Sequence, residues 1–132
     1  IQNQKNLGMA GSRNKGANSL NTDWALFIDD DNIIHPEMIT SLLDAVSKNK
    51  NIQAVAPVAY YYKNSVDIND YHSDDIWYAG ATLNMFVGKA RYEPIQEAEI
   101  YTTTILHNCF MIKRDLGEKH KWFDEGMYMV NT

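Results

Sequence analysis

The chain has 132 residues, of which 45% are hydrophobic and 22% charged, and its formal net charge is −5. This composition is ordinary for one soluble globular domain, and the acidic balance without any Lys/Arg run argues against a nucleic-acid-binding surface. The single Cys109 excludes an internal disulfide and a Cys-based zinc site. The sequence has no apolar stretch long enough to span a bilayer and no signal-peptide pattern.

Both ends of the sequence read as cut, since the chain begins at Ile1 without an initiator Met and stops at Thr132 without a capping signal. We therefore expect a segment of a longer protein. Because no repeat, low-complexity tract or linker interrupts the chain, residues 1–132 are interpreted as a single, partial domain.

The first half has the pattern of an α/β protein. Residues 9–20 predict a Gly-containing helix, and the apolar run at 24–29 predicts a buried strand. A second helix is expected to begin with Pro36 at its first position and to end near Lys48, with an apolar stripe made by Met38, Ile39, Leu42, Leu43 and Val46. Residues 52–62 predict the next strand, with Pro57 marking an edge or bulge, so the two strands should run parallel.

The second half predicts shorter, more mixed elements. A polar loop is expected at 63–75, short strands at 76–80 and 82–87, and then a charged loop. Residues 101–106 and 108–113 are strand candidates, followed by a short turn at 114–117, and a helix is expected to start within 124–130.

The most informative feature is the apolar run at 24–28 that ends in Asp29, Asp30 and Asp31. Three adjacent carboxylates cannot be buried together without a countercharge, and ligands of open α/β sheets bind at the carboxyl ends of strands. Carboxylate oxygens suit Mg²⁺ or Mn²⁺, so the pattern predicts a divalent-cation site that carries an anionic ligand such as a diphosphate. A turn would be needed for Asp31 to reach the metal, because neighbouring strand residues alternate sides. A solvated acidic turn that caps the next helix stays open as the alternative, whereas an EF-hand is excluded because its Gly and distal Glu are missing.

Other polar residues give weaker signals. Asn6, Gly8, Arg13, Asn14 and Gly16 could approach a phosphate, although an exposed helix face explains them equally well. The histidines, at 35, 72, 107 and 120, are scattered; His107 could be a third metal ligand, but a structural role is favoured. Cys109 is interpreted as a small buried hydrophobe, and Trp77 and Tyr78 as either sugar-stacking or core residues.

Four motifs follow one another along the chain. They are Asn6-Leu7-Gly8 with Ser12-Arg13-Asn14-Lys15-Gly16; Phe27-Ile28-Asp29-Asp30-Asp31-Asn32 with Pro36; Ile76-Trp77-Tyr78-Ala79-Gly80-Ala81; and Cys109-Phe110-Met111-Ile112-Lys113-Arg114 with Trp122-Phe123-Asp124-Glu125. In this order they resemble motifs of the inverting family 2 glycosyltransferases of the GT-A fold, in particular rhamnosyltransferase-like members, and the second corresponds to that family's Asp-x-Asp motif. Together the motifs extend over nearly the whole chain.

The resemblance implies a truncated α/β domain of the GT-A type, with a Rossmann-like, mostly parallel sheet. It implies a donor- and metal-binding part at 1–62 and an acceptor-side part at 63–132. Asp31 and Asp29 are expected to contact Mg²⁺ or Mn²⁺, and Arg13, Asn14, Asp29 and Asp30 to bind a nucleotide-diphosphate sugar. Trp77, Gly80, Asp124 and Glu125 are expected on the side of a glycan or lipid-linked acceptor.

The implied enzyme is a hexosyltransferase of cell-wall or polysaccharide synthesis, located in the cytoplasm or at the cytoplasmic face of a membrane through segments outside this chain. The family's usual strand before the first motif has no counterpart ahead of Ile1. Its usual general base lies in a Glu-Asp pair that would fall at Thr132 and one residue beyond. The catalytic base therefore stays unassigned, and the activity of the piece alone stays open.

Two other functions remain open. A nucleotidyltransferase also uses aspartate-bound metal on an α/β sheet, although the Gly-rich, Lys/Arg-bearing phosphate loop that it typically has is missing. A non-catalytic nucleotide- or glycan-binding module would bind ligand without turnover.

Overall fold

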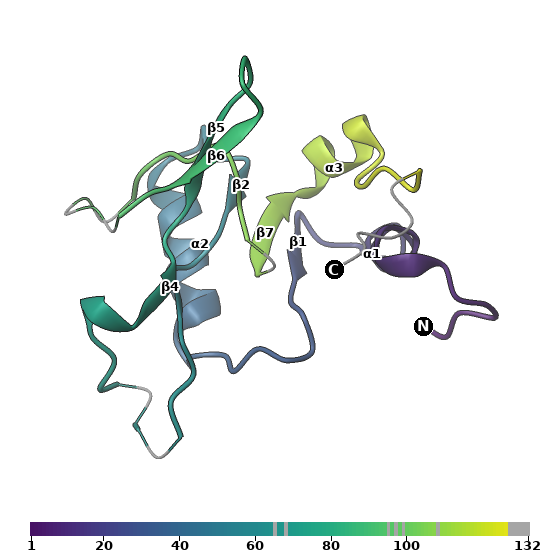
Figure 1. Ribbon diagram of the computed structural model, residues 1–132. Helices are drawn as coiled ribbons and strands as arrows, with labels where there is room; N and C mark the ends of the chain where they lie inside the picture. The colour runs from purple at the N-terminus through teal and green to yellow at the C-terminus, as the bar shows by residue number, and fades with distance from the viewer. Residues whose placement is uncertain are drawn as a thin grey trace. The chain divides into compact units, whose positions relative to one another are not determined.

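The computed structural model has short strands and three helices among the residues that it describes, which are 1–64, 66–67, 69–94, 96, 98, 100–107 and 109–126 (Figure 1). The α/β class predicted from the sequence is confirmed at this level. Two compact units divide the chain. The first combines Ile1–Phe27 with Met111–Thr132, and the second comprises Ile28–Phe110. The functional division at residue 62 is a separate matter and stays a prediction.

The first unit contains α1 (Gly8–Ala17), β1 (Trp24–Phe27), most of β7 (Phe110–Lys113) and α3 (Arg114–His120), with β1 and β7 neighbours in a sheet. Its buried apolar side chains are Ala17, Ala25, Phe27 and Met111. The Phe27 ring meets the Phe123 ring edge-on at 5.0 Å between centroids, a geometry that aromatic pairs favour. The helix and strand predicted at 9–20 and 24–29 are therefore present in shorter form.

Helix α3 replaces the turn predicted at 114–117. Arg114 Nε donates a hydrogen bond of 2.6 Å to Glu118 Oε1, an i,i+4 pair that supports a helix. The helix ends where Lys121 adopts the left-handed conformation and its N–H reaches the carbonyls of Gly117 and Glu118. Trp122 then folds back onto Gly117, where an added Cβ would lie 2.2 Å from the indole ring.

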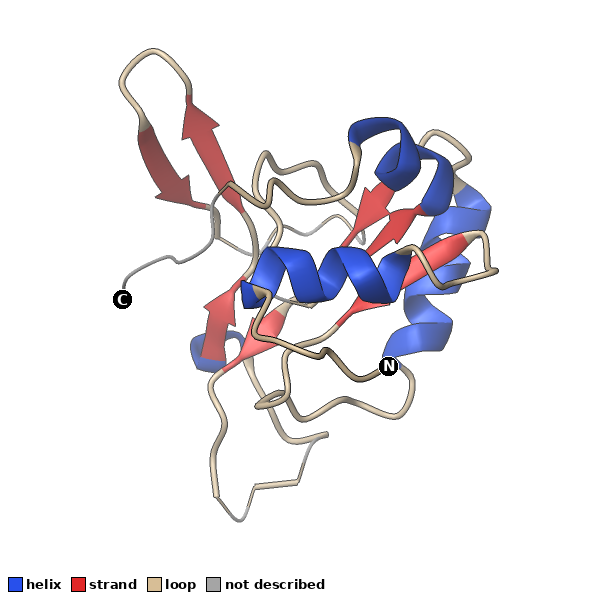
Figure 2. Ribbon diagram, turned by 90° about the vertical axis from the view of Figure 1, so that its right-hand side faces the viewer, coloured by secondary structure: helices blue, strands red, loops and turns tan. Residues whose placement is uncertain are grey.

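The second unit contains the remaining elements: α2 (Met38–Lys48), β2 (Ala54–Val55), β3 (Ala59–Tyr60), the short 3₁₀-helix η1 (Ser73–Asp75), β4 (Ile76–Tyr78), β5 (Ala81–Asn84) and β6 (Lys89–Tyr92). Strand β3 pairs antiparallel with β4, and β5 pairs antiparallel with β6. Figure 2 shows the β5–β6 hairpin with its loop standing clear of the other elements of this unit. The parallel arrangement expected for β1 and β2 concerns strands of different units and stays a prediction.

Helix α2 begins two residues later than predicted. Pro36 lies in a turn, in which Met38 N donates to the His35 carbonyl at 3.0 Å, and the first regular helical residue is Met38. Of the predicted apolar stripe, Leu42 and Val46 are buried, while Ile39 and Leu43 stay nearly half exposed. The stripe is therefore only partly covered by the described residues.

Two strand predictions and one loop prediction need correction. The strand at 52–62 is split into β2 and β3 by the segment around Pro57, which cannot donate to a ladder. The segment 101–106 forms only an isolated bridge between Ile105 and Ala81. The charged loop expected after 87 is instead β6, whose alternating Lys89, Ala90, Arg91 and Tyr92 fit one polar and one apolar strand face.

The helix predicted within 124–130 falls mostly outside the described residues, and Asp124, Glu125 and Gly126 are not helical. Within the part of the chain that the structure describes, no helix combines the length and apolarity needed to cross a membrane.

Candidate functional site

The three aspartates lie in a turn that begins two residues after β1. Asn32 N donates to the Asp29 carbonyl at 3.3 Å, and the Asn32 side-chain amide donates to that carbonyl at 3.2 Å and to Asp31 Oδ1 at 3.4 Å. Asp30 and Asp31 are exposed, whereas Asp29 is partly covered. The turn needed to bring Asp31 out of strand geometry is therefore present, formed by Asn32.

This acidic turn has suitable donor chemistry for a hard cation, although it is not a complete protein cage. Among the described residues, no group of three or more His, Cys, Asp or Glu side chains is gathered closely enough to hold a metal ion. Mg²⁺ and Mn²⁺ commonly use one or two carboxylates and complete their coordination with water and substrate phosphates. Exposed Asp30 and Asp31 carboxylates, with Asp29 beside them, fit that mode of binding.

His107 and Cys109 have surroundings that indicate packing. The His107 ring lies 4.1 Å from the Trp77 ring and 4.8 Å from the Tyr78 ring, and its Nδ1 is buried without a hydrogen-bond partner in the described structure. Cys109 is buried, its Sγ lies 3.7 Å from Met38 Sδ, and burial together with the charge of Asp29 raises the pKa of the Cys109 thiol. A raised pKa disfavours the nucleophilic thiolate, so the interpretation of Cys109 as a buried hydrophobe is confirmed.

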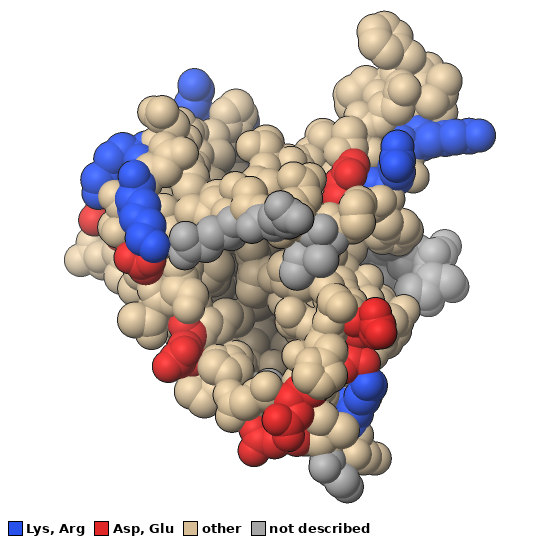
Figure 3. All heavy atoms as spheres, turned by 90° about the vertical axis from the view of Figure 1, so that its left-hand side faces the viewer, with Lys and Arg blue, Asp and Glu red and all other residues tan. Residues whose placement is uncertain are grey.

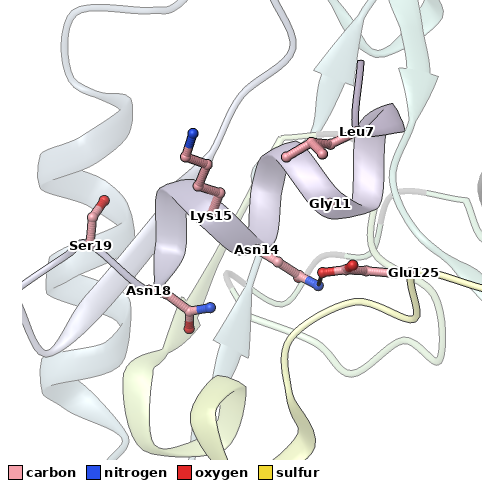
Figure 4. A pocket seen from close by; sticks show the side chains of 7 residues that line it. All are labelled: Leu7, Gly11, Asn14, Lys15, Asn18, Ser19 and Glu125. Carbon is pink, nitrogen blue, oxygen red and sulfur yellow. Dashed lines mark hydrogen bonds between the residues drawn. The ribbon is translucent and has the colours of Figure 1, made fainter. Parts of the chain in front are cut away.

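Asn14 connects α1 to the segment that follows α3 (Figure 4). Its Nδ2 donates to the Phe123 carbonyl at 2.9 Å and to Glu125 Oε1 at 2.8 Å, and its Oδ1 accepts from Phe123 N at 3.0 Å. Asn14 is buried, and both of its amide protons are used. We call this set of contacts the Asn14 bracket, comprising Asn14, Phe123 and Glu125.

A hollow of about 410 Å³ lies beside the bracket, lined by Leu7, Gly11, Asn14, Lys15, Asn18, Ser19 and Glu125 (Figure 4). The residues come from the α1 region and the loop after α3. Lys15 Nζ donates to the Gln2 carbonyl at 2.9 Å, and an added Cβ on Gly11 would lie 3.0 Å from Leu7 Cβ. The hollow is widely open and mixes polar with apolar surface, and Asn14 and Glu125 line it together.

The remaining predicted residues of the first unit lie near the bracket. The Arg13 guanidinium stands over the Phe123 ring at 5.5 Å from its centroid, which is cation–π distance. Asp124 is exposed, and its Oδ1 accepts from Gly126 N at 2.8 Å. The bracket therefore fixes the backbone immediately before the two acids that were predicted on the acceptor side.

Trp77 and Gly80 belong to an aromatic region of the second unit. Trp77 is 42% exposed, so part of its side chain is accessible, whereas Tyr78 is buried and its hydroxyl donates to the Ile105 carbonyl at 2.7 Å. Gly80 has a φ of +120°, and an added Cβ would lie 2.2 Å from Thr103 Cγ2. Core packing is confirmed for Tyr78, and glycine is required at position 80 on both conformational and steric grounds.

The structure thus joins Asn14 to Glu125, which were predicted for opposite substrates, and it places Arg13 beside Phe123. Asp29, Asp30, Asp31, Trp77 and Gly80 belong to the second unit. Sequence reasoning missed the bracket partner Phe123 because backbone groups carry no sequence signal. It also missed Trp122, whose indole N–H donates to Asn18 Oδ1 at 3.0 Å.

Comparison with known proteins gives the family. Residues 1–120 match the model of glycosyl transferase family 2, whose members have the GT-A-type nucleotide-sugar transferase fold and generally depend on a divalent metal ion. A protein of Haemophilus influenzae described as an uncharacterized glycosyltransferase is 42% identical over 55 residues, which are 42% of this chain and 19% of that protein. The chain thus spans about a fifth of the relative's length, and no solved structure matches it. With its family match over most of its length, the chain belongs to glycosyl transferase family 2.

Proposed function

We propose that this chain is part of an inverting glycosyltransferase that moves a sugar from a nucleotide-diphosphate donor to a hydroxyl of a glycan or lipid-linked acceptor. The observation that carries the proposal is the exposed acidic turn at Asp29–Asn32, in a chain whose family uses nucleotide sugars and divalent metals. Family membership also favours glycosyl transfer over nucleotidyl transfer.

In this proposal Asp31 and Asp29 hold Mg²⁺ or Mn²⁺, and Asp29 and Asp30 accept hydrogen bonds from the ribose or sugar of the donor. The metal ion, when bound, offsets the negative charge that develops on the departing diphosphate. Asn32 orients the turn through its bonds to the Asp29 carbonyl and Asp31 Oδ1, so it acts as a positioning residue.

The Asn14 bracket has a positioning role on the acceptor side. Because both amide protons of Asn14 are used by Phe123 and Glu125, its contribution to donor binding is best explained as indirect. The bracket holds Asp124 and Glu125 on a fixed backbone. Arg13, whose guanidinium lies over the Phe123 ring, keeps its proposed role of binding the nucleotide or phosphates of the donor. Trp77, whose side chain is partly exposed, and Gly80 are proposed to lie along the acceptor. No general base is assigned to a described residue.

The test is calorimetric titration of UDP, dTDP and GDP into the chain, with and without Mn²⁺. We expect one nucleoside diphosphate to bind only when the metal is present, and binding to be lost in Asp31→Ala. The matched control is Asp70→Ala, which removes another exposed carboxylate of the second unit from a loop with no proposed role.

Metal-dependent binding of equal strength in Asp31→Ala and the unaltered chain would contradict the metal role of the acidic turn. Pyrophosphate release from a nucleoside triphosphate would favour the nucleotidyltransferase instead. Binding that never leads to sugar transfer, in the full-length protein, would favour the non-catalytic module.

A further inference from the structure

The end of the β5–β6 hairpin exposes three consecutive apolar side chains. Met85 is 77% exposed, Phe86 is fully exposed and Val87 is 62% exposed. They lie in the turn between Asn84 and Gly88, which we call the hairpin tip. On the surface of a protein in water, single exposed apolar side chains are common, whereas contiguous ones more often mark an interaction site.

The hairpin tip is ordered by its own hydrogen bonds. Asn84 Oδ1 accepts from Phe86 N at 3.0 Å and from Val87 N at 3.4 Å, and Gly88 closes the turn with a φ of +62°. Two backbone N–H groups that would otherwise need water are therefore satisfied within the turn. Entry of the tip into an apolar medium would not leave these two donors without a partner, which lowers the cost of burying the turn there.

The two faces of the hairpin differ in polarity. Lys89 lies opposite Asn84, and Arg91 lies opposite Thr82, so these four side chains share one face. The other face pairs Leu83 with Ala90 and Ala81 with Tyr92. No acidic residue occurs from Ala81 to Tyr92, although the whole chain has a net charge of −5. Figure 3 shows Lys and Arg side chains beside a projecting end that carries no charge.

We propose that the hairpin tip docks on the surface of a membrane that contains anionic lipids. Met85, Phe86 and Val87 would enter the boundary between headgroups and acyl chains, while Lys89 and Arg91 contact the anionic headgroups, the combination that interfacial anchors use. A convex tip of three side chains offers far less than the roughly 800 Å² per partner of a stable protein interface, which favours a lipid surface over a second protein. The inference does not rest on the glycosyltransferase proposal, but it would bring the enzyme to lipid-linked acceptors.

The test is co-sedimentation of the 132-residue chain with vesicles of phosphatidylcholine alone or mixed with phosphatidylglycerol. We expect binding to the mixed vesicles that weakens as salt is added, because exposed charges are screened. Phe86→Asp should weaken binding by at least about tenfold, since burial of a Phe side chain stabilises by a few kcal/mol. The double variant Lys89→Glu and Arg91→Glu should weaken it by more than about tenfold and remove the preference for phosphatidylglycerol.

Matched controls separate these effects from general changes in charge or apolarity. Met9→Asp introduces the same charge at another exposed apolar side chain, 56% exposed on α1. Lys50→Glu with Lys119→Glu reverses two exposed charges elsewhere and reaches the same net charge as the hairpin double variant. Both controls should bind mixed vesicles within about threefold of the unaltered chain.

Three outcomes would overturn the proposal. The first is failure of the unaltered chain, folded by circular dichroism, to bind mixed vesicles. The second is an equal loss in Phe86→Asp and Met9→Asp. The third is a Phe86→Asp variant that keeps its vesicle binding but changes the sedimentation of the protein alone, which would assign the hairpin tip to a protein contact.

Discussion

The Asn14 bracket and the acidic turn come from two motifs of the same resemblance, yet they use their polar groups in opposite ways. Asn14 is buried and both of its amide protons are used within the protein. Asp30 and Asp31 are exposed on a four-residue turn that Asn32 forms. The bonds of Asn14 stabilise the fold, but they leave its amide protons unavailable to a ligand. The carboxylates of the acidic turn are available to a ligand but contribute little to stability. The polar residues of such motifs can therefore differ in role, since some stabilise the fold and others are available to bind a ligand.

The largest loss of stability is expected for a substitution in the first unit, near the Asn14 bracket. Gly117→Ala should lower the free energy of unfolding by about 3 kcal/mol, because the new Cβ would lie 2.2 Å from the Trp122 ring. Urea denaturation measures the change. In a Trp122→Ala background the same substitution should become neutral or favourable by up to about 1 kcal/mol, since Ala forms helix better than Gly. A cost that persists without the indole ring would contradict this packing.

Removing the Asn14 bracket should lower the free energy of unfolding by less than Gly117→Ala does. Asn14→Ala should lower the free energy of unfolding by about 2 kcal/mol, because the Phe123 N–H loses its acceptor in a partly buried site. The exposed Asn21→Ala is the control and should change little.

A second variant sharpens the assignment. Asn14→Asp keeps an acceptor for Phe123 N but places a carboxylate against Glu125, so its cost should fall when Glu125→Gln is added. Additive costs of the two substitutions would show that the Asn14–Glu125 contact is not formed in solution.

Asp75 of the second unit, unlike the exposed Asp30 and Asp31 of the acidic turn, is buried. The Lys63 ammonium and the His72 backbone N–H, as hydrogen-bond donors, hold the pKa of Asp75 below its ordinary value of 3.8. A lowered pKa in the folded state adds stability above the ordinary value, and that stability is lost as the pH falls through the folded-state pKa. Asp75→Asn should therefore lower the melting temperature at neutral pH, with a difference that shrinks below pH 3.8.

The matched control is Asp74→Asn, which removes the adjacent exposed carboxylate. Its melting temperature should follow that of the unaltered chain at every pH. If Asp75→Asn shows the same small, constant difference across the pH range, the Lys63–Asp75 pair is not stabilising. Because Lys63 is 46% exposed, the expected loss is smaller than that of either substitution in the first unit.

The smallest effect on stability is expected at the acidic turn. Asp31→Asn should leave the free energy of unfolding within about 0.5 kcal/mol of the unaltered value, because the carboxylate is exposed and the bond that it accepts from Asn32 is long, at 3.4 Å. The same variant should lose metal-dependent diphosphate binding. A large loss of stability would show that Asp31 is a structural cap, which is the alternative interpretation of this turn.

Local patterns predicted the elements whose determinants are close in sequence. The apolar run before Asp29 correctly predicted β1, and the spacing of Leu42 and Val46, with the helix breaker after Lys48, correctly predicted α2. The apolar neighbours of Cys109 in the sequence correctly predicted that this residue is buried. The alternation of polar and apolar residues at 89–92 is a strand signal for β6, and the i,i+4 spacing of Arg114 and Glu118 is a helix signal for α3. Gly88 and Gly117, which suggest turns, hid both signals. The candidate residues Arg13, Asp29, Asp31, Trp77 and Asp124 stay predictions in their functional roles.

The sequence by itself determined the α/β class, the acidic turn and the family resemblance, because each can be recognised from short local patterns and from the order in which they follow one another along the chain. Only the tertiary structure decided that Asn14 binds the backbone of Phe123 and the side chain of Glu125, 109 and 111 residues away. It also decided that Trp122 occupies the space above Gly117, and that the hairpin tip is exposed. Contacts to backbone groups and the exposure of a side chain depend on what the folded chain brings alongside, and no local pattern of residue types encodes that.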